Sequence, residues 1–382
     1  MIKVIFAGGG TGGHIFPAIA MANELKKRYP DAQIVFVGTK RGLETEVIPK
    51  FGFKIYFISV RGIKRKFNKE LLLFPYYLAK SFFQSNLVLR NINPDVVVGT
   101  GGYVSWPLVF LAAWKNIPTA IQEQNSYPGL STRLLSFFVD KVFIAYPDSI
   151  NYFLKKSNLK ICGNPVREDI SFGEKELALK EFGLEQDKKT LFIFGGSQGS
   201  KVINQAILDG LDLLEKKRDL QIIWQTGKDD FPKIKNITGQ REITLRIFPF
   251  IDDMRKTYAV SDLIVSRSGA LTLAEILCCA KPSILIPYLF AAADHQRYNA
   301  EFLEKNGAAM VILQKDLNGE KLANLILDLL KNVSKLEEMK KAAEKLAQPK
   351  ATSILVDEIV DLLRIKLKKS SLKLTSTSTG GD

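Results

Sequence analysis

The sequence predicts an α/β protein with two doubly wound domains, each built on a parallel sheet covered by helices on both faces. Three observations support this fold class. Short apolar runs rich in valine, isoleucine and phenylalanine alternate with segments of helical pattern, as in parallel α/β sheets. Glycine-rich turns follow three of these runs, at 8–13, 99–103 and 195–199. The alternation starts again after G-N-P-V-R (163–167), where a glycine and a proline mark a linker.

The first domain is expected to span residues 1–163. Its apolar runs are nearly continuous, which is typical of strands buried on both faces. The expected strands are 3–7, 33–38, 54–59, 95–99, 119–122 and 141–145, and the expected helices include 16–29 and 104–115.

The second domain is expected to span residues 164–350, and T-L-F-I-F-G-G-S-Q-G-S-K-V-I-N (190–204) opens its strand, turn and helix pattern. A helix at about 351–366 follows Pro349 and is assigned to the first domain. The low-complexity tail 367–382 is expected to be disordered. The later strands expected in the second domain are 221–225, 244–248, 263–266 and 283–287.

Composition and charge restrict the class of protein. The chain has 382 residues and a net charge of +14. Residues 1–163 carry 21 Lys and Arg against 9 Asp and Glu, whereas residues 164–382 carry 33 against 31. The first domain is therefore expected to meet an anionic partner, which could be a membrane, a nucleic acid or a phosphate group.

Cysteine, histidine and apolar patterns exclude further classes. The three cysteines have no C-x-x-C spacing and suit free thiols in a reducing compartment. The two histidines, without a cluster of other ligands, predict no zinc site. Glycine follows the first apolar run too early for a secretory signal, and no run approaches the roughly 20 apolar residues of a membrane span. We expect neither export nor a membrane-spanning helix.

The first glycine turn has two interpretations. Gly8, Gly10 and Gly13 satisfy G-x-G-x-x-G, a pattern that suggests dinucleotide binding when it follows a strand. The acidic residue that such Rossmann sites use for the ribose is missing from the end of the second strand, which reads V-F-V-G-T-K-R. Lys40 and Arg41 could instead hold a 2′-phosphate, so NADP is the first interpretation.

The repeated turns favour the second interpretation, a phosphate site shared by two domains that face each other across a cleft. All three turns fall at the carboxyl ends of predicted strands, where open α/β sheets bind ligands. Glycine lets backbone N–H groups approach an oxyanion, and the helix that follows adds the positive end of its dipole. A pyrophosphate could be stabilised there without a metal, and the sequence has no D-x-D motif. Some of these glycines could serve only the tight turns.

Seven motifs together resemble one enzyme family. They are G-G-G-T-G-G-H-I-F-P, G-T-G-G-Y-V-S-W-P, Q-E-Q-N-S-Y-P-G, G-N-P-V-R, G-G-S-Q-G-S, S-R-S-G-A-L-T-L-A-E and D-H-Q-R-Y-N-A. Over about residues 1–365, the chain resembles the peripheral membrane glycosyltransferases of peptidoglycan synthesis. The resemblance implies a GT-B fold and inverting, metal-independent transfer without a cofactor. N-acetylglucosamine would pass from UDP-N-acetylglucosamine to the muramyl sugar of undecaprenyl-pyrophosphoryl-N-acetylmuramyl-pentapeptide.

The same resemblance implies partners and a location. The partners would be the UDP-sugar, the lipid-linked acceptor, an anionic membrane surface and other cell-wall synthesis proteins, with no nucleic acid among them. The enzyme would work at the cytoplasmic face of the plasma membrane as a peripheral protein.

The resemblance places the sugar nucleotide on the second domain. Glu275 would accept both ribose hydroxyls, for which a carboxylate has enough lone pairs, and Arg167 would neutralise the diphosphate. On residue type alone, either side chain could simply be a surface charge. The other implied donor contacts are Ser197 at a phosphate, the main chain of Ile251 at the uracil, the backbone of Ala270, Leu271, Thr272, Leu273 and Ala274 beside the ribose and phosphate, Gln296 and Asn299 at the sugar, and Thr11, Gly12, Gly13 and Asn125 from the first domain.

Two of the other donor contacts have alternatives, and one residue lies where the family pattern varies. Ser197 could cap a helix, which does not exclude a phosphate contact, and Asn125 could cap a turn. Arg297 lies inside the sugar-contacting motif at a position where the family pattern varies, so the resemblance carries less information on sugar selectivity there.

His14 is the candidate general base. It follows Gly13 where a helix starts, and the helix dipole would lower the pKa of its imidazole by disfavouring the cation. A neutral imidazole could take the proton of the acceptor hydroxyl as that oxygen attacks the anomeric carbon, which gives inversion in one displacement. His14 could instead only position the acceptor pyrophosphate or order the loop. Glu123 and proton loss assisted by the substrate are the alternative bases.

Residues 61–83 form the candidate membrane patch. R-G-I-K-R-K-F-N-K (61–69) places five basic residues before L-L-L-F-P-Y-Y-L-A-K-S-F-F (71–83). Pro75 is expected in the first turn of a helix or at a break. A basic-rimmed apolar surface can lie on an anionic membrane, and the family places its patch here, near Trp114. The alternative is a core helix with a solvated basic loop.

Three other functions remain as alternatives. The first is another enzyme of the same fold, such as a glycolipid-forming transferase or a UDP-sugar epimerase, against which the acceptor-side motifs count. The second is an NADP-binding oxidoreductase. The third is a basic nucleic-acid-binding scaffold, which would have no need of glycine-lined clefts.

Overall fold

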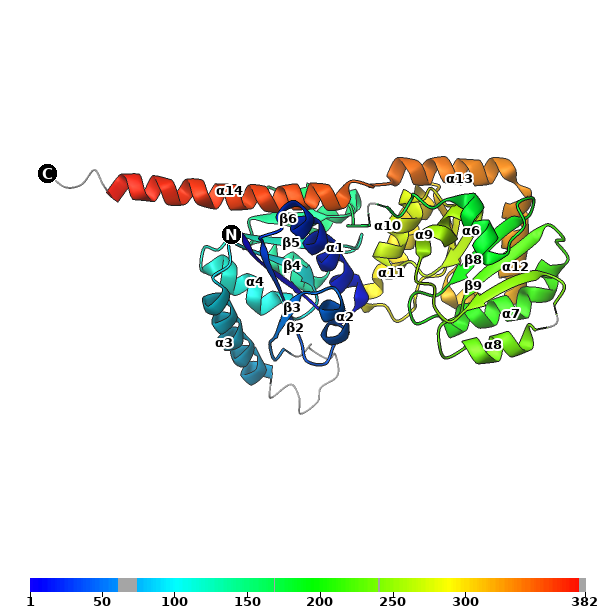
Figure 1. Ribbon diagram of the computed structural model, residues 1–382, viewed down its shortest axis with the longest axis horizontal. Helices are drawn as coiled ribbons and strands as arrows, with labels where there is room; N and C mark the ends of the chain where they lie inside the picture. The colour runs from blue at the N-terminus through cyan, green and yellow to red at the C-terminus, as the bar shows by residue number, and fades with distance from the viewer. Residues whose placement is uncertain (61–73, 168, 240, 378–382) are drawn as a thin grey trace. The chain divides into compact units, whose positions relative to one another are not determined.

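The computed structural model describes residues 1–60, 74–167, 169–239 and 241–377. The chain divides into two compact units (Figure 1). The first unit contains Met1–Pro165 and the C-terminal segment that begins at Lys350, and the second unit contains Val166–Pro349. Each unit is a parallel sheet with helices on both faces, which is the predicted fold class.

The first unit has a sheet in the order β3-β2-β1-β4-β5-β6-β7, all parallel in its described residues. The sheet order reverses between β1 and β4, which puts the loops after these two strands at the switch point of the sheet. The strands are β1 (Lys3–Gly8), β2 (Gln33–Gly38), β3 (Lys54–Phe57), β4 (Val96–Gly101), β5 (Thr119–Glu123), β6 (Lys141–Ile144) and β7 (Leu159–Ile161). The helices are α1 (Gly12–Arg28), α2 (Glu44–Lys50), α3 (Phe74–Ile92), α4 (Ser105–Trp114), α5 (Leu130–Leu135), the 3₁₀ helix η2 (Pro147–Tyr152) and α14 (Ala351–Thr377).

Alternate residues of the central strand enter two separate core layers. Val4 and Phe6 of β1 pack in a buried cluster with α1 and α14, while Ile5 and Ala7 pack on the opposite face with α3 and α4. This alternation is the period of two that a strand imposes on its side chains. It explains why the apolar runs are continuous, since both faces of the sheet are buried.

The C-terminal helix α14 completes the core of the first unit. Leu355 and Ile359 are fully buried in the cluster that contains α1. Arg28 of α1 holds this helix through Asp357, at 2.6 Å, and through the hydroxyl of Ser353, at 2.6 Å. The helix continues to Thr377, beyond the end near residue 366 that the sequence predicts. Glycine and proline are absent from the sequence between Ala351 and Thr377, so nothing in the backbone chemistry ends the helix earlier.

The second unit has a sheet in the order β10-β9-β8-β11-β12-β13, again parallel in the described residues, and its switch point lies between β8 and β11. Its strands are β8 (Lys189–Phe194), β9 (Leu220–Gln225), β10 (Thr244–Phe248), β11 (Leu263–Ser266), β12 (Ser283–Leu285) and β13 (Ala309–Val311). Its helices are α6 (Lys175–Phe182), α7 (Lys201–Glu215), α8 (Phe231–Ile237), α9 (Met254–Val260), α10 (Ala270–Cys278), η3 (Ala292–Asp294), α11 (His295–Lys305), η4 (Gln314–Asp316), α12 (Gly319–Lys331) and α13 (Val333–Leu346).

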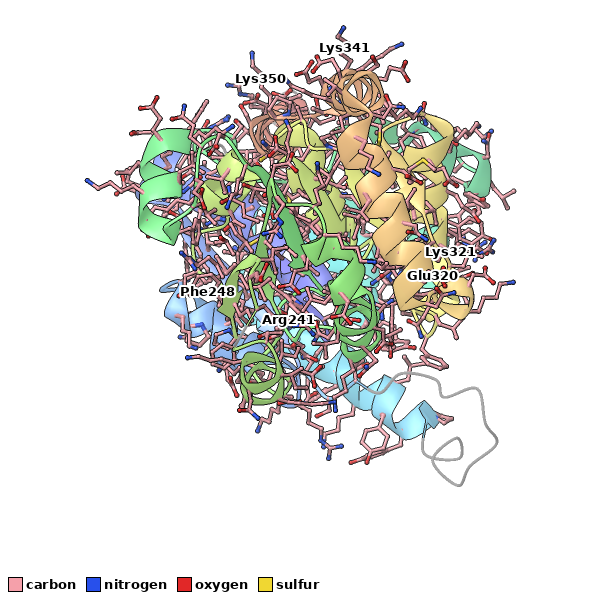
Figure 2. The ribbon with its side chains drawn as sticks, turned by 90° about the vertical axis from the view of Figure 1, so that its right-hand side faces the viewer. Arg241, Phe248, Glu320, Lys321, Lys341 and Lys350 are labelled. Carbon is pink, nitrogen blue, oxygen red and sulfur yellow. The ribbon has the colours of Figure 1, made fainter. Side chains whose placement is uncertain are left out.

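Charged side chains cover the outside of this second unit (Figure 2). Glu320 and Lys321 in the first turn of α12 and Lys341 on α13 are exposed. Arg241 forms an ion pair of 3.0 Å with Glu215 of α7. The apolar residues of the helices turn inward around Trp224, which is fully buried.

The sequence prediction missed two strands and placed some boundaries differently. β7 and β13 have three residues each and lie at sheet edges, so they lack a long apolar run. α1 begins at Gly12, four residues before the predicted start. The prediction began too late because Gly12 and Gly13, which open the helix, have low helix propensity. Among the described residues, no helix combines the length and the apolar character needed to cross a bilayer.

Candidate functional site

Two glycine turns meet at the switch point of the first unit. A Cβ atom at Gly102, after β4, would lie 2.5 Å from the carbonyl oxygen of Gly9, after β1. A Cβ atom at Gly101 would lie 2.6 Å from the His14 ring. Gly101 and Gly102 also have φ of +107° and +79°, so both space and backbone conformation require glycine here. The motif G-T-G-G-Y therefore allows close contact with the first turn and its histidine.

His14 occupies the third position of α1, and its ring is oriented by the turn. Its Nδ1 atom lies 3.1 Å from the carbonyl oxygen of Gly9 and 3.3 Å from the hydroxyl of Thr11. A carbonyl oxygen only accepts hydrogen bonds, so the contact with Gly9 requires a proton on Nδ1, and whenever the ring is neutral its lone pair is then on Nε2. This is the tautomer that a base acting through Nε2 requires. Thr11 and Gly13 are exposed at this helix start, and Gly12 is half-buried.

Glu44 is a buried carboxylate beneath the first glycine turn, and the sequence analysis missed it. Its Oε2 accepts the N–H of Gly10 at 3.0 Å, and its Oε1 accepts the N–H and hydroxyl of Thr39 at 2.9 and 2.8 Å. Burial raises the pKa of this carboxyl, but the hydrogen bonds from Gly10 and Thr39 outweigh it and hold the pKa below the ordinary value of 4.5. The N–H of Gly10 is therefore engaged inside the protein. The acid six residues after β2 was the signal that could have found it.

Glu123 and Asn125 form one hydrogen-bonded turn after β5. Glu123 is buried, and its Oε1 accepts the backbone N–H of Asn125 at 3.0 Å and the side-chain amide of Asn125 at 3.1 Å. Its Oε2 accepts the N–H of Gly129 at 3.1 Å. These contacts orient the Asn125 side chain, and they give Glu123 a structural task that the sequence analysis did not foresee.

A buried network of amides joins three motifs of the first unit. Gln124 donates to the carbonyl of Thr100 at 2.7 Å. The side chain of Asn164 accepts from Gln122 at 3.0 Å and donates to the carbonyl of Gln124 at 2.9 Å. Asn164 of the G-N-P-V-R motif thus anchors the end of the first unit to β5 and β4. Buried amides need such partners, because an unpaired one is costly.

In the second unit, a glycine turn again connects a strand to a helix at the switch point of the sheet, here β8 to α7. Ser197 is exposed in the turn after β8. The residue that caps α7 is Ser200, whose side chain accepts from the N–H of Ile203 at 3.4 Å. Ser197 therefore does not cap this helix, and its hydroxyl lies on the exposed part of the turn.

Arg267, after β11, is the second residue that the sequence analysis missed. Its guanidinium is buried and donates to the Ser200 hydroxyl at 2.8 Å and to the carbonyls of Ile286 and Pro287 at 3.0 and 3.1 Å. It also lies over the ring of Tyr288, 5.4 Å from the centroid. Burial lowers its pKa to about 10, so it stays positive at neutral pH. A buried cation thus connects the two loops of this switch point.

Glu275 of α10 is held by a buried tyrosine. The hydroxyl of Tyr258, on α9, donates to its Oε2 at 3.0 Å. Burial raises the pKa of Glu275, while the Tyr258 hydroxyl and the positive charge of Arg167 oppose part of that rise. Arg167 is exposed, and its charge acts on both Glu275 and Tyr258. The structure thus brings together the two charged residues predicted for the ribose and the diphosphate.

Ile251 is fixed by a side chain from β9. The Oε1 atom of Gln225 accepts the N–H of Ile251 at 2.8 Å, and the Nε2 atom of Gln225 donates to the carbonyl of Gly196 at 3.0 Å. One buried amide therefore sets both the second glycine turn and the predicted uracil-reading segment. Since the N–H of Ile251 is engaged, its carbonyl is the main-chain group that could read a base.

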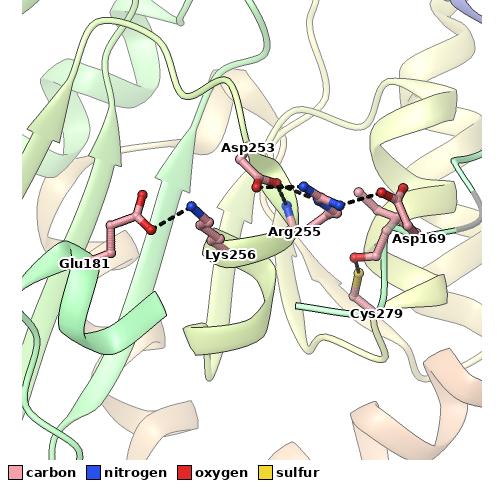
Figure 3. Close-up of polar contacts among 7 residues, drawn as sticks. Asp169, Glu181, Asp253, Arg255, Lys256 and Cys279 are labelled. Carbon is pink, nitrogen blue, oxygen red and sulfur yellow. Dashed lines mark hydrogen bonds and ion pairs between the residues drawn. The ribbon is translucent and has the colours of Figure 1, made fainter. Parts of the chain in front are cut away.

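An ion-pair cluster on α9 fixes the segment next to Arg167 (Figure 3). Arg255 contacts Asp253 at 2.9 Å and Asp169 at 2.5 Å. The thiol of Cys279 donates to the carbonyl of Ile170 at 3.4 Å. Lys256 pairs with Glu181 of α6 at 2.6 Å. One short helix thereby holds the chain just after Arg167 and, through Tyr258, the carboxylate of Glu275.

The two residues predicted for the sugar differ in their surroundings. Gln296 is half-buried, and its Oε1 accepts the N–H of Tyr288 at 3.0 Å. Asn299 is fully buried and donates to the carbonyl of Ser268 at 3.3 Å, so it supports the S-R-S-G turn from behind. Arg297 pairs with Glu301 on its own helix at 2.9 Å. In the predicted backbone stretch, Ala270 and Leu273 are buried, whereas Leu271, Thr272 and Ala274 are half-buried.

In the part of the chain that the structure describes, no three His, Cys, Asp or Glu side chains gather in a way that could hold a metal ion. Arg267 puts a positive charge at the switch point of the second unit, the charge of Arg167 acts on Glu275, and the starts of α1 and α7 add the positive ends of their helix dipoles.

Comparison with known proteins agrees with this arrangement. The chain matches the Glycosyltransferase family 28 N-terminal domain over residues 4–144 and the Glycosyltransferase family 28 C-terminal domain over residues 190–355. The chain belongs to glycosyltransferase family 28. This family 28 glycosyltransferase is 41% identical over 364 residues to a protein of Finegoldia magna, covering 95% of this chain and 98% of that one. The relative is named UDP-N-acetylglucosamine--N-acetylmuramyl-(pentapeptide) pyrophosphoryl-undecaprenol N-acetylglucosamine transferase.

Solved structures of similar fold include a MurG and a UDP-GlcNAc 2-epimerase. The glycosyltransferase resembles MurG of Acinetobacter baumannii with a TM-score of 0.77 and 31% identity, over 94% of this chain and 100% of that one. It also resembles the UDP-GlcNAc 2-epimerase of Neisseria meningitidis with a TM-score of 0.64 and 16% identity, over 94% and 100% of the two chains. The second likeness shows a shared fold alone. The predicted GT-B fold and glycosyltransferase class are thus confirmed, and the fold is one that epimerases share.

Proposed function

We propose that this glycosyltransferase moves N-acetylglucosamine from UDP-N-acetylglucosamine to undecaprenyl-pyrophosphoryl-N-acetylmuramyl-pentapeptide, with inversion and without a metal. The observation that carries the proposal is the pair of switch-point sites, one with an oriented histidine and one with a carboxylate beside an arginine. The names of relatives above 40% identity over nearly the whole chain support the choice of donor and acceptor.

The second unit would bind the donor. Glu275, held by Tyr258, accepts the two ribose hydroxyls, and the carbonyl of Ile251 accepts the N–H of the uracil. Ser197 and the backbone from Ala270 to Ala274 contact the ribose and phosphates, while Arg167 balances the charge of the diphosphate. Gln296 contacts the sugar through its amide nitrogen, since its oxygen accepts from Tyr288. The buried Asn299 shapes the turn next to the sugar.

The first unit would bind the acceptor and supply the base. The acceptor hydroxyl oxygen forms a bond to the anomeric carbon while the bond from that carbon to the diphosphate oxygen breaks. His14 takes the hydroxyl proton on Nε2, and UDP leaves with the electron pair of the broken bond. Asn125, Thr11, Gly12 and Gly13 contact the donor from this unit. Glu123 is the weaker candidate for base, because both its oxygens accept hydrogen bonds from its own turn.

The membrane side of the proposal rests on exposed apolar residues of the first unit. Tyr76 and Phe83 on α3 are 59% and 63% exposed, and Trp114 at the end of α4 is 77% exposed. Phe82 faces the other way and packs against Trp106 at 6.0 Å between ring centroids. Residues 61–73 of the candidate patch 61–83 lie outside the described residues. An undecaprenyl chain cannot leave the bilayer, so the enzyme would bind the anionic cytoplasmic surface as a peripheral protein.

A transfer assay tests the function. The purified chain is given labelled UDP-N-acetylglucosamine and the lipid-linked muramyl-pentapeptide in mixed vesicles, and the labelled lipid is separated from free sugar. We expect a labelled lipid-linked disaccharide, and its absence despite donor binding would refute the proposal. His14→Ala is expected to lower kcat by about 10²–10⁴, the usual range for a general base. Near-normal turnover would remove His14 from the chemistry.

Binding measurements separate the remaining alternatives. A fluorescence titration should detect UDP and show no binding of NADPH at equal concentration. Incubation with UDP-N-acetylglucosamine alone should leave the sugar configuration at C2 unchanged, which an epimerase would alter.

A further inference from the structure

The peptide unit between Gly9 and Gly10 is hydrogen-bonded on both sides. Its N–H donates to Oε2 of Glu44 at 3.0 Å, and its carbonyl oxygen accepts from Nδ1 of His14 at 3.1 Å. A peptide unit is planar and rigid, and its N–H and C=O point in opposite directions. A buried carboxylate and the candidate base are therefore connected through one rigid group.

The carboxylate of Glu44 is enclosed by the two loops that it joins. The side chain has no exposed surface, and Thr39 binds its other oxygen with both the N–H and the hydroxyl. A Cβ at Gly9 would lie 2.5 Å from Oε1, and a Cβ at Gly38 would lie 2.7 Å from Cγ. A Cβ at Gly42 would overlap the carboxylate. Three glycines thus leave the space that this carboxylate fills.

The electrostatic effect runs from the carboxylate to the imidazole. The hydrogen bonds from Gly10 and Thr39 keep the pKa of Glu44 low, so the group is ionised at neutral pH. A negative charge at the N–H end of a peptide unit strengthens the carbonyl as an acceptor, because linked hydrogen bonds polarise one another. Thr11, whose hydroxyl lies 3.3 Å from Nδ1, carries no charge, and neither do Gly101 and Gly102 beside the ring.

We propose that Glu44 is a positioning residue that acts on His14 through the Gly9–Gly10 peptide. It fixes the tautomer with Nδ1 protonated and raises the basicity of Nε2. The inference deepens the proposed function, since it rests on His14 as the base, but its structural part concerns the ring alone. The arrangement resembles a carboxylate that orients a catalytic imidazole, with a peptide unit inserted between them.

The first test compares Glu44→Gln with Glu46→Gln. Glu46 is exposed on the same helix, so its substitution makes the same change of charge without touching the glycine turn. We expect Glu44→Gln to lower kcat by about tenfold or more, the size of effect seen when a metal-bound histidine loses the carboxylate that orients it, with the KM for UDP-N-acetylglucosamine within about twofold of the parent enzyme. The acid limb of the pH profile should move to lower pH, because the imidazolium loses a stabilising negative charge. Equal kcat and an unmoved acid limb in both variants would overturn the proposal.

A second pair of variants keeps the proposal testable if Glu44→Gln does not fold. Gly42→Ala leaves the first glycine turn and His14 intact, but its methyl group must displace the Glu44 carboxylate. It should reproduce the loss of kcat with little change in donor KM. Glu44→Asp keeps the charge and should restore the acid limb to its parental position, even if kcat recovers only in part. Parental kcat in Gly42→Ala would count against the proposal.

Nitrogen NMR of the imidazoles separates this inference from the proposed function. The chain has two histidines, so a His295→Gln variant assigns the spectrum. In the parent enzyme, His14 should titrate from a neutral form protonated on Nδ1, and in Glu44→Gln it should show mixed tautomers and a lower midpoint. An unchanged His14 spectrum rejects the role of Glu44. Normal turnover in His14→Ala rejects the base, and the NMR comparison still decides whether Glu44 sets the tautomer.

Discussion

Replacing Tyr258 by phenylalanine should weaken donor binding without changing the shape of the core. Tyr258 is 1% exposed, and its hydroxyl donates to Glu275 at 3.0 Å. A hydrogen bond to a charged group contributes about 1.5–3 kcal/mol. If about 1–2 kcal/mol of this orients the carboxylate for the ribose, Tyr258→Phe should raise the KM for UDP-N-acetylglucosamine by roughly 5–30-fold. kcat should change little, since the proposed role of Glu275 concerns the ribose and not the bond that breaks.

The assay uses two donors that differ only at the ribose. The parent enzyme should prefer UDP-N-acetylglucosamine over its 2′-deoxyuridine analogue, because the analogue lacks a hydroxyl that we propose Glu275 accepts. Tyr258→Phe should reduce that preference as well as raise the KM. Phe192 is also fully buried, and its ring meets that of Tyr258 edge to face at 6.2 Å between centroids, so Phe192→Leu provides a control that alters packing and leaves the hydroxyl in place. A KM that rises equally for both donors, or rises as much in the control, would refute the orienting role.

Three further predictions concern Glu275, metal ions and the exposed aromatic residues. Glu275→Gln should raise the thermal midpoint at pH 7. Burial raises the pKa of Glu275 in the folded protein, so the ionised carboxylate lowers stability at any pH above the pKa that Glu275 has in the unfolded chain. The gain in Tm should therefore vanish well below pH 4.5, which a scan of Tm against pH would show. A chelator should leave turnover unchanged, whereas a loss that added Mg²⁺ restores would contradict a diphosphate neutralised by Arg167 and helix starts. The pair Phe83→Ser and Trp114→Ser should reduce sedimentation with anionic vesicles by about tenfold, with donor binding unaltered, and equal sedimentation would exclude this surface from membrane contact.

The sequence was sufficient for the fold because the apolar runs and glycine turns are local signals. Most strands of both sheets, including Gln33–Gly38 and Thr244–Phe248, lie where the pattern predicts them. The edge strands β7 and β13 were not predicted, because three residues are too few to show an apolar run. Their position depends on pairing with the neighbouring strand.

The candidate site was predictable only where a motif carries it. Ser197, Glu275 and His14 stand in recognisable glycine or helix-start contexts. Glu44 and Arg267 did not, because their meaning depends on contacts across the sheet: Glu44 reaches back to Gly10, and Arg267 reaches Ser200 from another strand. From the sequence alone, a charged residue is expected at the surface, and only the fold shows which chain segments bury it.

The order in which the chain leaves the ribosome bears on how each unit acquires its core. Residues 166–349 are contiguous, so the second unit can complete its sheet as soon as it has been synthesised. The first unit waits longer, because Leu355 and Ile359 of the last helix fill the layer beside Val4 and Phe6. Helix α1 covers part of that layer early, but the part that α14 covers stays exposed throughout translation of the second unit. A stop codon just before Ala351 would therefore yield an aggregating polypeptide, even though every residue proposed for the chemistry had been made.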